Sequence, residues 1–262
     1  MTICVAAIGK NTEANEEFIV FATDHMVSVS TGQFEQVIEK FKLIDEHTVA
    51  MFSGQALLFD RIMHDIGNKK EKLTYEQIVE LTHQRMKKVR FELFEEQVLS
   101  VYDIDFKYVK NILDKQVQNP FIQTILEKLS EHNLGSAVML IGFKDGFAQV
   151  TVVNEFIHYN FRDMNFGAIG SGETQALNTL MFQTHSKEEP LSTTLYNVYK
   201  AKRNSEVSVG VGKETDLYVL SPKKLVEVTQ AQKDFLEKVY LDELSYGKKD
   251  ERVKKIVGEL AK

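Results

Sequence analysis

The chain has 262 residues, of which 43% are hydrophobic and 27% charged, as in ordinary globular proteins. Its net charge of −6 argues against binding nucleic acid through a broad basic face. Cys4 is the single cysteine, so no intrachain disulfide can form. No apolar run approaches the ~18 residues of a membrane span, and the first residues lack the pattern of a signal peptide. We therefore expect a cytoplasmic protein with no membrane and no nucleic-acid partner.

Apolar runs in the first part of the chain predict short strands. The first two flank a polar segment, Gly9–Glu17, which is typical of a loop. The predicted strands cover residues 3–8, 18–23, 27–30, 41–44 and 48–52.

The period of the pattern then changes to that of helices, from Gln55 to His132, where there is almost no strand signal. Pro120 is expected in the first turn of the last helix of this block. Strands return at 137–143 and 147–153, joined by the turn signal Lys144-Asp145-Gly146. Later segments alternate between predicted helices at 174–184, 191–203, 230–241 and 251–260 and predicted strands at 207–211 and 217–220.

The order of these blocks predicts an α+β fold. Strands joined by hairpin turns pair in antiparallel fashion, and helices grouped in blocks pack on the outer faces of sheets. A four-layer αββα sandwich of two antiparallel sheets accommodates the predicted number of strands and helices. No internal repeat or low-complexity linker divides the chain, so residues 1–262 are expected to form one domain.

Four features carry candidate chemistry, although each alone has a plain structural interpretation. Thr2 follows Met1, and removal of the methionine would leave a threonine whose own α-amine can act as the base for its hydroxyl. Asp24 ends a predicted strand, Lys40 precedes another, and Gly170-Ser171-Gly172 ends a third. A turn residue, a surface lysine and a simple turn would explain these three equally well.

Taken together, the segments that contain these residues resemble the β subunits of the proteasome and the related HslV-type bacterial peptidases, which are N-terminal nucleophile (Ntn) hydrolases. The resemblance covers about two thirds of the chain. It is carried by Thr2–Ile8, Phe18–Asp24, Lys40–Gly54, Ala137–Phe143 and Ala168–Ala176. It implies the αββα fold, a threonine-type endopeptidase acting on peptides or unfolded proteins, a homo-oligomer, and an ATPase partner.

The resemblance also implies a role for each matching residue. Thr2 would be the nucleophile, and Asp24 would hold Lys40 by a salt bridge. The charge of Lys40 would favour loss of the hydroxyl proton. Ser171 would hydrogen-bond the terminal amine, and the backbone N–H of Gly54 would stabilise the oxyanion.

Substrate contacts are implied in the same way. Phe52 would line a specificity pocket for apolar side chains, and the substrate would lie as an added strand between Ser28 and the Gly54 segment. The family's supporting Arg-Asp-Ser-x-Ser stretch falls on residues 203–208, where Asn204 replaces the acid and Ser208 matches only with a one-residue slip. Against the family, residues of about 85–133 form a helical insertion and about 222–262 a C-terminal helical extension.

Other functions remain open at this point. The same acyl-enzyme could serve a transpeptidase or protein ligase, in which a peptide amine replaces water, and Asn204 and the insertions would also suit a non-catalytic scaffold subunit. Cys4 is a rival nucleophile. No histidine pair has a zinc-site spacing such as His-Glu-x-x-His, and Ser171 lacks the Gly-x-Ser-x-Gly frame of serine hydrolases. We expect no metal and no cofactor.

Overall fold

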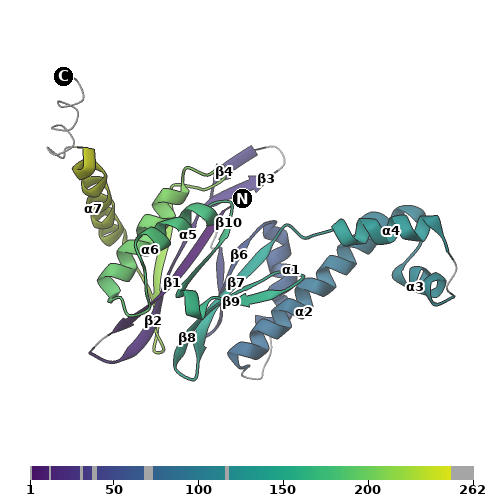
Figure 1. Ribbon diagram of the computed structural model, residues 1–262, viewed down its shortest axis with the longest axis horizontal. Coiled ribbons are helices and arrows are strands. Elements are labelled where there is room, and N and C mark those ends of the chain that lie inside the picture. The colour runs from purple at the N-terminus through teal and green to yellow at the C-terminus, as the bar shows by residue number, and fades with distance from the viewer. Residues whose placement is uncertain are drawn as a thin grey trace, which may run out of the picture.

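The computed structural model describes residues 2–11, 13–29, 32–36, 40–67, 73–115 and 118–248. Two antiparallel five-stranded sheets form the body of the molecule (Figure 1). The first sheet has, in spatial order, β10 (Phe166–Gly170), β1 (Ile3–Asn11), β2 (Glu16–Asp24), β11 (Thr215–Leu220) and β12 (Leu225–Glu227). The second has β5 (Phe41–Asp45), β6 (Thr48–Ser53), β7 (Ala137–Lys144), β8 (Phe147–Val153) and β9 (His158–Asn160).

The two sheets pack face to face, and their central strands are buried on both sides. In β1, Cys4, Ala6 and Ile8 join the core between the sheets, while alternate residues face a layer of helices. This double burial explains why the strand reads as one continuous apolar run instead of an alternating pattern. Met51 of β6 and Met139 of β7 meet β1 from the other sheet.

Helices cover the outer faces of both sheets. On the first sheet lie α5 (Glu173–Phe182), α6 (Leu191–Ser205) and α7 (Gln230–Lys248), and on the second lie α1 (Ala56–Gly67) and α2 (Tyr75–Phe94). Thr74 caps α2 with a capping box, because its side chain accepts from Gln77 N–H while the Gln77 side chain accepts from Thr74 N–H. The described chain therefore stacks as helices, sheet, sheet, helices.

The far end of α2 leads away from the body into a helical arm (Figure 1). The arm continues through a π-helical turn at Glu95–Leu99, a 3-10 turn at Ser100–Tyr102, α3 (Phe106–Asp114) and α4 (Pro120–Glu131). It has a hydrophobic cluster of its own, built around Phe94, Leu99, Val109, Ile122 and Ile125. The interpretation of this segment as an insertion in a single domain stays a prediction.

Most of the expected elements are present, including α4 with Pro120 in its first turn. The β7–β8 hairpin turns at Asp145 and Gly146, both with positive φ, as a type I′ turn requires. Two expectations are wrong. Residues 207–211 form turns and no strand, and the polar segment Gly9–Glu17 mostly continues β1 and β2, which stay paired to Asn11 opposite Glu16.

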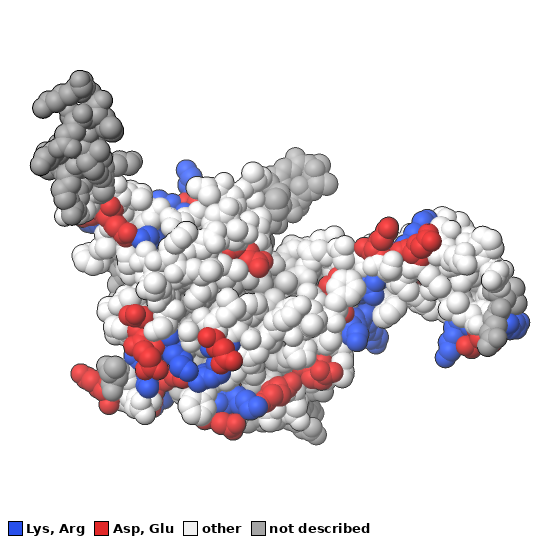
Figure 2. Space-filling view, viewed as in Figure 1, with Lys and Arg blue, Asp and Glu red and all other residues white. Residues whose placement is uncertain are grey.

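A short hairpin of β3 (Met26–Val29) and β4 (Gly32–Glu35) follows β2. The helix predicted at 251–260 lies outside the described residues. Within the described part of the chain, no helix is both long and apolar enough to cross a membrane. On the face drawn in Figure 2, acidic and basic side chains are interspersed, and the described residues there form no broad basic surface.

Candidate active site

The pairing of β1 with β2 brings Thr2 beside Asp24. Thr2 directly precedes β1 and Asp24 ends β2, and the register that sets Cys4 opposite Thr23 carries the two together. The N–H of Ile3 donates to Asp24 Oδ1 at 3.1 Å, and the Thr2 hydroxyl donates to the same oxygen. Two residues far apart in sequence are thus held in direct contact by the sheet.

Lys40 joins them from the second sheet. Its backbone carbonyl accepts from Phe52 N–H at 3.1 Å, which fixes the chain just before β5. Its ammonium donates to Thr2 Oγ1 at 2.5 Å and to Asp24 Oδ1 at 2.6 Å. A third bond, to the carbonyl of Met26 at 2.6 Å, uses the remaining proton. We call Thr2, Asp24 and Lys40 the Thr2 cluster.

Asp24 is the centre of the cluster and is fully buried. Besides Thr2, Ile3 and Lys40, its carboxylate accepts from the N–H groups of Met26 at 3.2 Å and Gly212 at 2.7 Å. A buried carboxylate is stable in its charged form when a cation and several donors replace the lost water. Its oxygens are therefore occupied by donors, which suits an anchor better than a proton acceptor.

Lys202 supports this arrangement, and sequence reasoning missed it. Its ammonium, buried in α6, donates to the carbonyls of Gly212 and Lys213 at 3.0 and 2.6 Å and to Glu206 at 2.7 Å. Burial lowers the pKa of Lys202, and Glu206 opposes that effect. These bonds hold the loop whose Gly212 N–H binds Asp24. The available signal was a lysine four residues after Val198, on the apolar face of its helix.

The glycine-rich end of β10 contacts the backbone of Thr2. The Ser171 hydroxyl donates to the Thr2 carbonyl at 3.3 Å, and Gly172 N–H approaches the same oxygen at 3.4 Å. Gly170 has φ of +106°, and a side chain there would lie 2.2 Å from the Thr2 carbonyl oxygen. The Gly-Ser-Gly run is therefore needed for close approach to the first residues of β1.

Two of the three predicted substrate-binding residues, Phe52 and Gly54, lie at and just beyond the end of β6. Gly54 has φ of +124°, and a Cβ there would clash with Ser136. Phe52 is buried in the core under α1, where its ring stacks on Phe59 at 5.0 Å. Ser28 lies in β3, and its side chain lies outside the described residues. The roles predicted for these three residues stay predictions.

Asn204 and Ser208 are not brought to the Thr2 cluster by any bond in the described structure. The Asn204 amide donates to Thr179 at 3.0 Å and accepts from the Tyr240 hydroxyl at 2.8 Å, so it ties α6 to α5 and α7. The Ser208 hydroxyl is buried and has no partner among the described residues. Their proposed support of the terminal amine stays a prediction.

Cys4, the rival nucleophile, is fully buried between the sheets. Its thiol lies 3.5 Å from the Phe52 carbonyl. Burial raises the pKa of the thiol to about 12, although Lys40 acts in the opposite direction. A thiol that stays protonated at neutral pH is a poor nucleophile. Thr2 is therefore the better candidate of the two.

The comparisons with known proteins do not assign the site. No protein-family model matches the chain, and no curated protein sequence matches it. The chemistry must follow from the geometry alone. A hydroxyl that touches an ammonium held by a buried carboxylate is arranged for nucleophilic attack, because the adjacent positive charge favours the alkoxide.

Proposed function

We propose that this chain is a threonine peptidase of the N-terminal nucleophile type, with a proteasome-like αββα fold. The observation that carries the proposal is the position of Lys40 Nζ, 2.5 Å from Thr2 Oγ1 and 2.6 Å from Asp24 Oδ1. Thr2 directly precedes β1, Asp24 ends β2 and Lys40 directly precedes β5, so the contact depends on how the two sheets pack and not on local sequence.

The proposed reaction begins with removal of Met1, which gives Thr2 a free α-amine. The Thr2 oxygen attacks the carbonyl carbon of a peptide bond, and the hydroxyl proton passes to that amine. The proton then moves to the departing peptide amine as the C–N bond breaks, leaving an ester on Thr2. Water attacks the ester, releases the carboxylic acid and restores the hydroxyl. Lys40 stabilises the oxygen of Thr2, and Gly54 N–H is proposed to stabilise the oxyanion.

The substrate class follows from the chemistry. Thr2 is 3% exposed, so the proposed removal of Met1 must also uncover its hydroxyl before a substrate can reach it. Extended peptides or unfolded proteins suit a site at the end of a sheet strand, because an extended chain can add as a further strand alongside β-structure near the site. Assembly as a homo-oligomer and delivery of substrate by an ATPase belong to the same proposal.

The decisive experiment combines mass and labelling. Intact mass and N-terminal sequencing of protein from the native host should show a chain that begins at Thr2. A β-lactone should then add one label, mapped to Thr2. Thr2→Ala should abolish the label, Thr2→Ser should retain it, and Cys4→Ala should leave it unchanged because the thiol is buried.

Two outcomes would overturn the proposal: a mature chain that keeps Met1, or a label that survives Thr2→Ala. Substrate turnover then separates two fates of the acyl-enzyme. Products that end in a free carboxylic acid, formed by attack of water on the acyl-enzyme, indicate the peptidase. Products joined to an added peptide amine, at the expense of hydrolysis, would assign the chain as a transpeptidase with the same nucleophile.

A further inference from the structure

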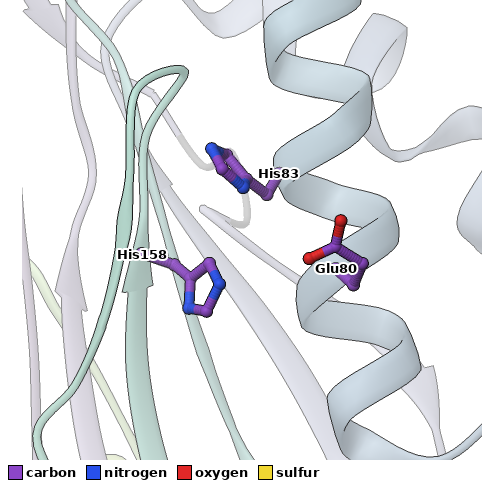
Figure 3. Close-up of side chains that lie close together, drawn as sticks. All are labelled: Glu80, His83 and His158. Carbon is purple, nitrogen blue, oxygen red and sulfur yellow. The ribbon is translucent and has the colours of Figure 1, made fainter.

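Three side chains with metal-binding atoms meet on the outer side of the second sheet, away from the Thr2 cluster. Glu80 and His83 lie on α2, and His158 is the first residue of β9. One ligand atom from each lies within 4.8 Å of the other two. Figure 3 shows the His83 and His158 rings between the helix and the strand, with the Glu80 side chain on the helix beside them. We call this set the Glu80 cluster.

The helical pair has a simple origin in the sequence. Glu80-Leu81-Thr82-His83 places the carboxylate and the imidazole three residues apart, and residues at that spacing share one face of a helix. The same Glu-x-x-His spacing presents metal ligands in helical bundles. His158 comes from a distant part of the chain, so no local spacing motif could reveal the set.

The nitrogen atoms of the cluster are not used elsewhere in the described structure. His83 Nε2 is buried and has no hydrogen-bond partner among the described residues. The rings of His83 and His158 meet edge to face, with centroids 5.4 Å apart. A buried imidazole nitrogen without a partner is costly unless it has a ligand. This unpartnered nitrogen, in a ring that also contributes a ligand atom to the cluster, is the observation that points to a metal.

The surrounding charges allow a cation. Lys144 lines the same hollow but is paired with Glu76, so its charge is compensated. Glu80 is exposed and accepts a bond from Gln84 Nε2 at 2.7 Å, which leaves most of its carboxylate available. The hollow has a volume of about 340 Å³. Its polar lining includes Gln149 and Asn160, which hydrogen-bond each other at 2.9 Å.

We propose that Glu80, His83 and His158 bind a zinc-class divalent transition-metal ion. Two imidazoles and one carboxylate suit Zn²⁺ and its neighbours, whereas Mg²⁺ and Ca²⁺ prefer oxygen ligands alone. Bonds of about 2.0–2.1 Å in a tetrahedral site place ligand atoms about 3.3 Å apart. The ligand atoms, which lie within 4.8 Å of one another, are therefore at most about 1.5 Å too far apart, and rotation of the exposed Glu80 and His158 side chains can bring them together.

Three protein ligands leave a fourth tetrahedral position, and two of the ligands, Glu80 and His158, also line the hollow. A solvent molecule or a small anionic ligand can occupy that position. The ion would also tie α2 to β9, the edge strand of the second sheet. The Glu80 cluster shares no residue with the Thr2 cluster, so this inference does not depend on the proposed peptidase activity.

The test is metal titration of the full chain after chelator treatment. Co²⁺ should bind with one equivalent and give the intense visible absorption of a tetrahedral ion, and one equivalent of Zn²⁺ should remove that absorption. Substituting a residue that only hydrogen-bonds to a metal ligand costs about 10–100-fold in metal affinity. Loss of a ligand itself, in His83→Gln or His158→Gln, should therefore cost at least about 100-fold. Mg²⁺ should not compete.

Two controls keep the result interpretable. His47→Gln, which alters a histidine in a different hollow, should bind Co²⁺ as the unaltered chain does. Equal unfolding midpoints of the metal-free variants would show that they fold. The proposal is overturned if no Co²⁺ or Zn²⁺ binds at micromolar concentration, or if binding persists unchanged in both His83→Gln and His158→Gln.

Discussion

The Thr2 cluster and the Glu80 cluster both gather polar side chains from separate elements, but they differ in how their hydrogen bonds are completed. Asp24 accepts from five donors, and every proton of the Lys40 ammonium has an acceptor. In the Glu80 cluster, His83 Nε2 is buried without a partner among the described residues. The first cluster is closed by the protein itself, and the second is open.

This difference teaches what each cluster requires. A closed network is preorganised, because no solvent or side chain must rearrange before a developing charge is stabilised. In an open cluster, a polar atom has no partner among the described residues. This indicates that a ligand from outside the chain completes it. Substitutions in the closed cluster should therefore change stability and reactivity, whereas those in the open cluster should change metal affinity.

The largest loss of stability is expected for Asp24→Ala. The change leaves the Lys40 ammonium without its counter-ion and orphans three backbone N–H groups, so unfolding free energy should fall by about 3–5 kcal/mol. Urea unfolding measures it. Asp145→Asn, at an exposed turn with φ of +52°, is the control and should stay within about 0.5 kcal/mol. Equal losses in the two variants would show that the network around Asp24 is not closed.

Lys40→Met should separate reactivity from stability. Methionine keeps most of the side-chain volume, and Asp24 retains its three backbone donors, so the loss should be about 2–3 kcal/mol. The rate of β-lactone labelling at Thr2 should fall by about 10²–10⁴-fold. The labelling rates and the urea unfolding curves of the variant and of the unaltered chain can be measured on the same samples. A labelling rate within threefold of the unaltered chain, about 0.7 kcal/mol, would remove Lys40 from the mechanism.

A pH series on Glu17→Gln tests a second closed ion pair, that of Glu17 in β2 with Arg162. Burial alone would raise the pKa of Glu17, but hydrogen bonds from Arg162 and from Ala148 N–H outweigh it and lower the pKa. A carboxyl with a lowered folded-state pKa stabilises the fold above its unfolded value, near ~4.3, and loses that effect as pH falls further. Unfolding free energies should therefore differ by about 1–2 kcal/mol at pH 7 and converge below about pH 4.

Glu16→Gln is the matched control for this series. Glu16 is adjacent in sequence, but its partner Lys223 is exposed at the surface, with Nζ 3.0 Å from the carboxylate. Exposed pairs contribute little, so the change should stay below about 0.5 kcal/mol at every pH. A difference for Glu17→Gln that stays constant down to pH 3 would show that the ion pair is not its origin.

The smallest effect is expected for Ser208→Ala. This variant compares a hydroxyl without a partner among the described residues with the hydrogen-bonded hydroxyl of Ser205. The Ser208 hydroxyl is buried and has no partner among the described residues, so its removal breaks no hydrogen bond there and should lower unfolding free energy by less than about 0.5 kcal/mol. Ser205→Ala should cost about 1 kcal/mol, because that hydroxyl donates to the carbonyls of Gly172 and Ala201. Equal losses would mean that Ser208 has a partner, as its predicted role beside the amine requires.

The sequence predicted the α+β class and the hairpins of consecutive strands, such as 137–143 with 147–153, because apolar runs and turn residues act locally. It also named Thr2, Asp24 and Lys40, which the fold brings into contact. It failed at 207–211, where an apolar-polar alternation forms turns instead of a strand. It also missed Gly212, whose contribution is a backbone N–H that no residue pattern marks.

The Glu80 cluster escaped for a different reason. Glu80 and His83 are readable as a helical pair, but their partner His158 depends on which strand lies at the edge of the second sheet. That order is set by long-range pairing and not by spacing. Lys202 lies between these cases, because a lysine on the apolar face of α6 is visible in the pattern while its acceptors are not.

α2 belongs to two hydrophobic cores at once. Ile78, Met86 and Val89 pack with the body, and Phe94 packs with the arm. The arm can therefore unfold without exposing the hydrophobic core of the body. This local unfolding should end between Phe94, which packs in the arm, and Val89, which packs in the body. Amide hydrogen exchange should show this as a step within one continuous helix, with slow exchange through Val89 and faster exchange from Phe94 onward. The boundary between two cooperative units then falls inside a single element.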